Sequence, residues 1–362
     1  MKKAKILIIL IFTTSLIGCT DIENVNPNND FEKTNKFSIS ELMDWENAKI
    51  VDIGFYPKFE EAGVVQNDNY CFYPQDGTKI VRIDKSNKEQ KVILELAVKK
   101  GKDIGVQICL ANDMLLIEYE GDLYECNFDG EEEHKIISSK KLRKQISSMI
   151  DSPLDREHNI IQGMKFYQGD LYLFLSSFNI MKLDLVTKEF VQVAQHTDEG
   201  CFFNDELFYI DFSAASMYKV NLSNLKRKCI RGKDKERDAE KNGFYYTIME
   251  VNNQIYYTKR YKHEAPSLYE LSLDGNDKKI YEFPGLSSDF IVANNDSTSV
   301  VAEYYDHVKE EKYLQVYNIK ESVAKKVKLP ENFGTLAFLV DDMAFYSKST
   351  SDDKYLLGLE LK

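Results

Sequence analysis

The sequence lacks several features that define large classes of protein. Basic residues are outnumbered, with 47 Lys and Arg against 59 Asp and Glu and a formal net charge of −12. Because nucleic-acid binding requires clustered positive charge, no nucleic-acid partner is expected. After residue 18 there is no apolar run of about 18 residues or more, which excludes a polytopic membrane protein. A glycine period and a sustained heptad are absent, which excludes a collagen or a coiled coil.

Motifs of catalysis, cofactor binding and metal binding are missing as well. The five histidines never lie within four residues of one another, and no HExxH or HxH pattern occurs. There is no GxSxG elbow, Walker A loop, GxGxxG or acidic calcium loop. We interpret the acid pairs Glu60-Glu61 and Asp341-Asp342 as solvated, because neighbours on a strand point to opposite faces. The sequence therefore assigns no catalytic, cofactor-binding or metal-binding residue.

Aromatic residues, by contrast, are abundant. The chain has 362 residues, of which 43% are hydrophobic, with 22 Tyr and 21 Phe against a single Trp. This composition rules out disorder for most of the chain and suffices for a large core. The pairs Tyr245-Tyr246, Tyr256-Tyr257 and Tyr304-Tyr305 would alternate between the two faces of a sheet. Most of these rings are expected between sheets, and some Tyr at a rim could stack on sugars or peptides.

The N-terminus has the pattern of an export signal. Lysines at positions 2, 3 and 5 precede the apolar run Ile6 to Phe12, and the segment ends in Leu16-Ile17-Gly18-Cys19. This ending resembles the lipobox of bacterial lipoproteins, in which the cysteine is acylated and becomes the first residue. The resemblance implies lipid attachment at Cys19 and an extracytoplasmic protein anchored to the bacterial membrane; the alternative is an ordinary secretory signal with a chance cysteine.

We divide the chain into three parts on this basis. Residues 1–18 are predicted to be a signal peptide, and residues 19–47 a lipidated cysteine followed by a flexible tether rich in Asn. Residues 48–362 are predicted to form one domain. Its five cysteines have no CxxC or zinc-ligand spacing, which favours buried thiols over a disulfide framework, although one bridge is compatible with export.

A repeat of about 46 residues runs through this domain. Each unit contains a turn-forming pair between two β-rich runs. The seven pairs are Asn67-Asp68, Asn112-Asp113, Gln168-Gly169, Asn204-Asp205, Asn252-Asn253, Asn295-Asp296 and Asp341-Asp342. Asn, Asp and Gly tolerate the positive φ that tight hairpin turns require.

A second landmark follows each pair and predicts a third strand that ends in a polar turn. Examples are Ile80 to Asp84, Ile180 to Asp184 and Met217 to Asn221. With a fourth strand after it, each unit holds four short antiparallel strands, which is typical of a propeller blade. We therefore predict a single all-β, seven-bladed β-propeller of four-stranded antiparallel blades, with six or eight blades as the alternative.

The last unit has only three strands before the chain ends. An orphan strand at Lys49 to Ile53 precedes the first unit. We predict that this N-terminal strand closes the last blade, since an uncovered edge promotes aggregation.

Two segments resemble a known family. Leu123 to Gly130 and Leu268 to Gly275 are similar to the Leu-Tyr-x-Φ-x-Φ-Asp-Gly element of bacterial lipoproteins with YWTD/TolB-like or domain-of-unknown-function β-propellers. The sequence has no Trp-Asp dipeptide, no Tyr-Trp-Thr-Asp and no kelch-type Gly-Gly pair. The resemblance therefore implies the fold and not an activity.

An insertion at residues 138–161 interrupts the repeat and is predicted to contain a helix. Leu142, Ile146, Met149 and Ile150 share one helical face, and four basic residues lie near the helix start. One interpretation is a short helix packed on the propeller with its apolar side inward. The other is a docking element for anionic lipid or an acidic partner.

These observations favour a monomeric, lipid-anchored binding or scaffold module on the cell surface over an enzyme. Its ligand would be a protein, peptide or glycan, and no cofactor is expected. The alternative is an exported propeller enzyme, a glycan hydrolase or lyase, with acids converging on the central channel.

Overall fold

The computed structural model describes most of the predicted domain. The described residues are 42–43, 50–55, 65–75, 78–87, 89–96, 106–150, 160–197, 199–213, 215–232, 243–261, 265–283, 291–293, 299–306, 309–329, 335–340, 343–349 and 354–360. Cys19, the signal peptide and nearly all of the tether lie outside these ranges, as do Glu60-Glu61 and Asp341-Asp342. No helix in the described part of the chain has the length and apolar character needed to cross a membrane.

The first three sheets along the chain follow one another in sequence. Their strands are β3 (Val65–Gln66), β4 (Tyr70–Gln75), β5 (Lys79–Asp84) and β6 (Gln90–Glu95), then β7 (Gln107–Ala111), β8 (Met114–Tyr119), β9 (Asp122–Asn127) and β10 (His134–Ile137), and then β11 (Ile161–Tyr167), β12 (Asp170–Leu175), β13 (Asn179–Leu183) and β14 (Phe190–Gln195). Helix α1 (Ser139–Ile146) lies between β10 and β11.

Two further sheets have the same form, and two more include an N-terminal strand. The strands of the former are β15 (Gly200–Phe203), β16 (Glu206–Asp211), β17 (Ser216–Asn221) and β18 (Arg227–Arg231), then β19 (Phe244–Val251), β20 (Gln254–Arg260), β21 (Ser267–Leu271) and β22 (Asp277–Glu282). The latter consist of β23 (Ile291–Ala293), β24 (Ser299–Asp306), β25 (Glu311–Asn318) and β26 (Val323–Leu329) with β1 (Leu42–Met43), and of β27 (Thr335–Val340), β28 (Met343–Ser349) and β29 (Lys354–Glu360) with β2 (Ile50–Phe55).

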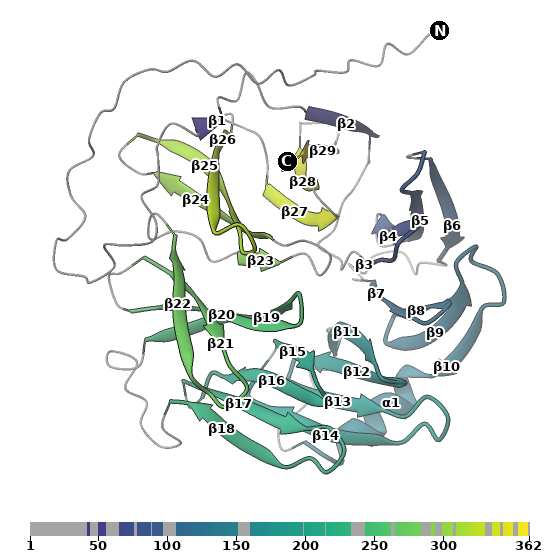
Figure 1. Ribbon diagram of the computed structural model, residues 1–362. Helices are drawn as coiled ribbons and strands as arrows, with labels where there is room; N and C mark the ends of the chain where they lie inside the picture. Colours follow the sequence, from purple (N-terminus) through teal and green to yellow (C-terminus); the bar gives the residue numbers. More distant parts are fainter. Residues whose placement is uncertain are drawn as a thin grey trace, which may run out of the picture.

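The sheets follow one another around a ring, which confirms the all-β propeller fold (Figure 1). The prediction of seven four-stranded antiparallel blades is wrong, however. The structure has six blades of that form, and the remaining sheet has five strands in the order β1-β26-β25-β24-β23. Its fifth strand, β1, runs parallel to β26. The repeat in the sequence could not reveal this strand, because β1 comes from the tether and not from a repeat unit.

The N-terminal strand occupies the position expected for it in the last sheet. β2 pairs antiparallel with β29, with Ile50 opposite Leu359 and Val51 opposite Gly358. Residues close to the two ends of the domain therefore share one sheet. This pairing covers the outer edge of β29 and makes β2 the outer strand of the sheet.

Four of the five described hairpin pairs contain the positive φ expected from their residue types, whereas Asn67-Asp68 does not. Both residues have positive φ in Gln168-Gly169, Asn204-Asp205 and Asn252-Asn253, and Asn112 also has positive φ. Each of these pairs joins the first and second strands of its sheet. The turn chemistry thus explains why the repeat is visible in the sequence.

In five of the sheets, the polar residue at the end of the third strand accepts a backbone hydrogen bond from the turn that follows. Asp184 accepts hydrogen bonds from the backbone N–H groups of Val186 (2.7 Å) and Thr187 (2.9 Å). Asp84, Asn127, Asn221 and Asn318 accept equivalent bonds from residues that follow them. These Asx turns lead the chain into the fourth strand.

Alternation of strand direction gives the ring two distinct faces. The turns between first and second strands and those between third and fourth strands lie on one face, which we name the hairpin face. The turns between second and third strands lie on the opposite face, with the connections from one sheet to the next; we name it the connector face. First strands of successive sheets lie close together, including β7 beside β11 and β15 beside β19, so they form the inner wall of the ring.

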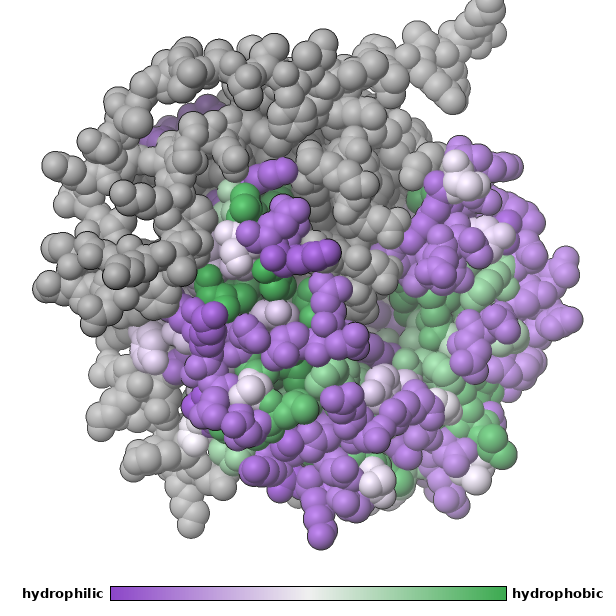
Figure 2. All heavy atoms as spheres, viewed as in Figure 1, coloured by the Kyte–Doolittle hydropathy of each residue, from purple (hydrophilic) through white to green (hydrophobic). Residues whose placement is uncertain are grey.

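The hydrophobic core lies between neighbouring sheets. Leu171 and Leu173 of β12 pack toward sheet β7–β10, whereas Tyr172 packs toward sheet β15–β18. On the side viewed in Figure 2, hydrophilic residues cover much of the described surface, and hydrophobic residues show between them over several sheets. Of the paired tyrosines, Tyr245, Tyr256 and Tyr257 are buried between sheets as predicted, and Tyr305 is exposed.

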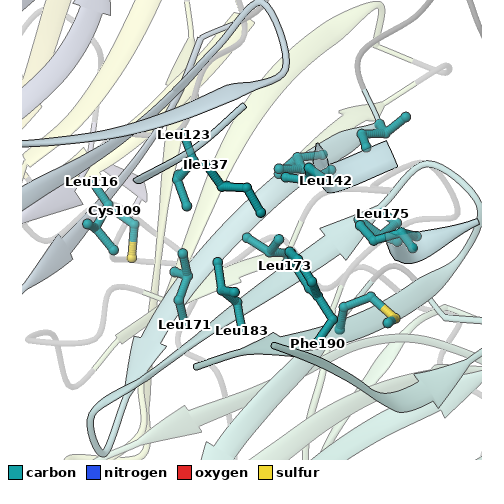
Figure 3. Packing of buried hydrophobic residues seen from close by; sticks show 14 of the residues in the cluster. Cys109, Leu116, Leu123, Ile137, Leu142, Leu171, Leu173, Leu175, Leu183 and Phe190 are labelled. Atoms are coloured by element: carbon teal, nitrogen blue, oxygen red, sulfur yellow. The ribbon is translucent and has the colours of Figure 1, made fainter. Parts of the chain in front are cut away.

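Helix α1 packs with its apolar side inward. Leu142 and Ile146 are buried against residues of β9, β10 and β12, including Leu123, Ile137 and Leu173 (Figure 3). The carboxylate of Asp122 accepts a hydrogen bond from the first N–H of the helix, at Ser139 (2.6 Å). The helix ends at Ile146, earlier than expected. Consequently Met149 is exposed and not on the buried face, although Ile150 is buried.

Candidate ligand-binding face

The two faces of the ring differ in the large hydrophobic residues that they expose. The exposed aromatic residues among those described all lie at the connector face: Phe178, Phe212, Phe244 and Tyr305. The turns of the hairpin face expose aliphatic residues in their place: Val186, Leu225, Leu273 and Val323. Because aromatic rings are favoured at recognition surfaces, the connector face is the candidate functional face.

Two of the exposed rings lie on adjacent sheets and are held by one connection. Phe178 lies in the turn between β12 and β13, and Phe212 in the turn between β16 and β17. The N–H of Thr197 donates to the Phe178 carbonyl oxygen (3.0 Å), and the N–H of Phe212 donates to the His196 carbonyl oxygen (3.0 Å). Because His196 and Thr197 are consecutive, these bonds join the backbones of the two phenylalanines to the same connection.

The imidazole of His196 lies in the same region and is about half exposed. Its Nδ1 is 3.1 Å from Ser213 Oγ and 3.8 Å from Asp211 Oδ2. The phenylalanine side chains are 49% exposed at Phe178 and 45% at Phe212. We name Phe178, His196 and Phe212 the aromatic patch.

The buried carboxylate of Asp211 stabilises the turn that carries Phe212. Asp211 accepts hydrogen bonds from the Ser213 N–H (2.9 Å), from Ser213 Oγ (2.6 Å) and from Arg227 Nη2 (2.6 Å). The guanidinium of Arg227 also lies over the Tyr218 ring, 3.5 Å from its centroid. These contacts fix the conformation at Phe212, because Asp211 and Ser213 are the residues directly before and after it.

Asp211, Ser213 and His196 do not form a nucleophilic triad. In such a triad the serine and the carboxylate contact opposite nitrogens of the imidazole. Here both lie on the Nδ1 side. The Ser213 hydroxyl donates its single hydrogen to Asp211, so Nδ1 of His196 is the donor toward Ser213 Oγ. The arrangement positions an imidazole and does not activate the serine.

A second buried acid lies at the connector face, next to helix α1. Glu118 near the end of β8 accepts a hydrogen bond at Oε1 from the Gly121 N–H (2.7 Å), while Oε2 has no hydrogen-bond partner among the described residues. Burial raises the pKa of Glu118 to about 8, against the opposing effects of the Gly121 bond and of Arg143. At neutral pH the carboxyl is therefore mostly protonated.

The two buried acids do not converge on one site. Glu118 shares a strand face with Leu116, which packs toward sheet β11–β14 from one side. Asp211 shares a face with Tyr209, which packs toward the other side of that sheet. Sheet β11–β14 thus separates them, which does not fit a pair of acids acting on one bond.

Other candidate groups are dispersed as well. Cys71, Cys109, Cys126 and Cys201 are buried and Cys229 is half-buried, and no disulfide joins any two of these five, which confirms the preference for buried thiols over a disulfide framework. Burial raises the pKa of Cys109 and of Cys126 to about 11. In the part of the chain that the structure describes, no three His, Cys, Asp or Glu residues are grouped as metal ligands would be.

The sequence did not single out Phe178 or Phe212. The prediction for rim aromatics concerned tyrosines, whereas two of the three patch residues are phenylalanines. One signal was available: Ser176-Ser177-Phe178-Asn179 and Asp211-Phe212-Ser213 each place a large apolar residue inside a polar turn. Such a residue has no core to enter and must face solvent.

Comparisons with known proteins support the fold. No family model matches the sequence, and no curated protein matches it. Among solved structures, the chain resembles an oligogalacturonate lyase from Vibrio parahaemolyticus (TM-score 0.59, 13% identity, 87% of this chain and 94% of that chain). It also resembles the WD40 repeats of RRP9 (TM-score 0.54, 9% identity, 86% and 97%) and YCF48 bound to a D1 peptide (TM-score 0.52, 8% identity, 87% and 95%). At these identities the likeness extends to the β-propeller fold alone.

Proposed function

We propose that this chain is a lipid-anchored, extracytoplasmic β-propeller that binds a protein, peptide or glycan through the aromatic patch of its connector face, without catalysing a reaction. The observation that carries the proposal is the pair of exposed phenylalanines whose backbones are hydrogen-bonded to the connection that carries His196. Phenyl rings supply apolar contact area to peptides and to the apolar faces of sugars, and an imidazole adds a directed hydrogen bond. Binding at one end of a propeller axis is common because the loops there vary independently of the sheets.

The rigid support of the patch is a second argument for binding. Phe178 and Phe212 are held by backbone hydrogen bonds, and the turn at Phe212 is fixed by Asp211. A preorganised surface loses less conformational entropy when a ligand binds. The proposed anchor at Cys19 would keep this surface at the membrane, with the tether allowing the ring to turn.

Site-specific photo-crosslinking in cells tests the binding face. A benzophenone amino acid would replace Phe178 or Phe212 in the full chain. Leu225 and Leu273, which are 37% and 47% exposed on the hairpin face, provide matched control positions. We expect a discrete adduct, identified by mass spectrometry, at Phe178 and Phe212 and not at Leu225 and Leu273. The same adduct at all four positions, or adducts only at the hairpin face, would refute the proposed face.

The anchor has a separate test. Cells grown with an alkyne-tagged fatty acid should label the wild-type chain and not the Cys19→Ala variant. Membrane fractionation should show the variant released from the membrane. Labelling that persists in Cys19→Ala would exclude this cysteine as the attachment site.

A further inference from the structure

The outer strands of the six four-stranded blades share an irregularity. In each blade the pairing between the outer strand and its neighbour shifts in register, so that the outer strand contains at least one extra residue. The extra residues are Ile93, Ile136, Val193, Ile230, Ile280 and, in β2, Ile53 with Gly54. Such β-bulges bend an edge strand and interrupt its row of backbone groups, which prevents another strand from pairing with it.

The five-stranded sheet is different at this position. Its strand β26 pairs with β25 without any shift, from Lys312 opposite Leu329 to Asn318 opposite Val323. β26 is also the strand that accepts an additional partner. β1 lies along it in parallel, with Leu42 opposite Lys326 and Met43 opposite Val327. The sheet whose outer pairing has no bulge is thus the sheet whose edge has been extended.

Charge complements this geometry. β26 carries Lys325, Lys326 and Lys328 within seven residues. In the sequence, β1 is flanked by Glu41 on one side and by Asp44 and Glu46 on the other. The two apolar residues that pair with β26 therefore lie within an acidic stretch of the sequence.

We propose that the outer edge of β26 is a docking site for an extended acidic peptide of a partner protein, which adds to the sheet as a parallel strand. Leu42 and Met43 occupy this edge in the absence of the partner. Only two of the seven β26 residues pair with β1, so a longer peptide gains more main-chain hydrogen bonds and displaces it. This site is on the circumference of the ring and is independent of the aromatic patch.

A disulfide lock tests the proposal in the full-length chain. Met43 and Val327 are direct partners in the register, so the double variant Met43→Cys, Val327→Cys can be oxidised to hold β1 in place. The probe is a fluorescent peptide with the sequence of residues 39–46, Ile-Ser-Glu-Leu-Met-Asp-Trp-Glu. We expect the peptide to bind the wild-type and the reduced variant, and to bind the oxidised variant at least tenfold more weakly. Equal binding to oxidised and reduced forms would overturn the proposal.

A second variant tests the competition without a covalent bond. Leu42→Pro removes a backbone donor from β1 and weakens its pairing. The peptide should then bind several-fold more tightly than to the wild-type chain, because the intramolecular competitor is lost. Unchanged or weaker binding would contradict the view that β1 and the peptide use the same edge.

A matched charge reversal separates strand docking from general attraction. Lys325→Glu, Lys326→Glu should reduce peptide affinity at least tenfold. The control is Lys278→Glu, Lys279→Glu in β22, where the same Lys-Lys pair precedes a bulged Ile280, and it should change affinity less than twofold. Equal losses in both variants would show non-specific attraction and overturn the proposal. Concentration-dependent dimerisation that the disulfide lock abolishes would instead identify the occupant as a second copy of this chain, which also overturns it.

Discussion

The hairpin face and the connector face use their polar residues in opposite ways. On the hairpin face, Asp184 and Asn221 accept backbone hydrogen bonds within their own turns, and the same arrangement recurs from blade to blade. On the connector face, Asp211 and Glu118 are buried and differ in their partners: Asp211 accepts from Arg227, and Glu118 accepts from the Gly121 N–H. The comparison teaches that the periodic residues specify the fold, while the residues that depart from the period distinguish one blade from another.

The largest expected effect is that of Glu118→Gln on the pH dependence of the free energy of unfolding. The pKa of Glu118 is raised by burial from 4.5 to about 8, so the folded state keeps a proton that the unfolded state releases. Stability is then fully present below about pH 4.5 and falls as pH rises toward 8, by roughly 3 to 5 kcal/mol in total. In thermal unfolding, Glu118→Gln should abolish most of this decline, because an amide does not ionise.

The control for Glu118 comes from the hairpin face. Hydrogen bonds lower the pKa of Asp184, so its contribution is present above about pH 3.8 and is lost in acid. Asp184→Asn should therefore leave the slope between pH 5 and 8 unchanged. An equal slope in wild-type and Glu118→Gln would show that this carboxyl is not the titrating group.

Gly130→Ala should be the most damaging substitution on the hairpin face itself. Gly130 has φ of +82°, and a Cβ there would lie 1.9 Å from the carbonyl oxygen of Ile93 in the preceding sheet. Left-handed strain and this clash together should cost on the order of 3 kcal/mol or more. Gly169→Ala is the matched control, since φ is +89° but nothing lies within 4 Å, and it should cost only about 1 kcal/mol. Equal midpoints in urea unfolding would contradict the importance of the contact between sheets.

Two carboxylates at opposite ends of β16 allow the faces to be compared within one strand. Asp211, at the connector end, is buried and binds Arg227, whereas Glu206, at the hairpin end, is about one-fifth exposed and binds Lys219 at 2.7 Å. Asp211→Asn should destabilise the fold by about 2 kcal/mol, because the buried carboxylate accepts from three donors and the amide removes its charge. Glu206→Gln should cost less than about 1 kcal/mol, since the Glu206 carboxylate is partly exposed to water. The reverse order in denaturant unfolding would show that burial does not distinguish the two ends.

The smallest stability effect is expected at the aromatic patch. Phe178→Ser and Phe212→Ser remove exposed rings that contribute little to the core, so each should change the free energy of unfolding by no more than about 0.5 kcal/mol. Circular dichroism melting curves provide the measurement. A loss of several degrees in either variant would mean that the ring supports the fold and is not a free surface.

The contrast between the faces also explains what the sequence could predict. The hairpin pair Asn252-Asn253 and the turn residue Asp184 were predictable because positive φ and Asx turns are local properties of a few residues. The closing strand at Ile50 was predictable because the last repeat unit contains only three strands and an unpaired strand precedes the first unit. β1 was not predictable, because its pairing depends on the regular outer edge of β26. The bulges that distinguish the other outer strands from β26 leave no local pattern in the sequence.

The candidate site was harder to predict than the fold. Phe178, His196 and Phe212 are brought together by backbone hydrogen bonds between segments that are 16 to 34 residues apart in the sequence. The pKa of Glu118 depends on how closely sheet β11–β14 and helix α1 cover it. Lipid attachment at Cys19 and the YWTD/TolB-like assignment stay predictions from sequence patterns.

Partner capture by two double variants is the most direct test of the central claim that the connector face carries the function. The full-length chain with Phe178→Ala, Phe212→Ala would be compared with Leu225→Ala, Leu273→Ala, using the partner identified by crosslinking from Phe178. We expect the phenylalanine variant to lose at least 90% of the captured partner and the leucine variant to retain it, with both variants folded. Full retention by the phenylalanine variant, or an equal loss in both, would contradict the account.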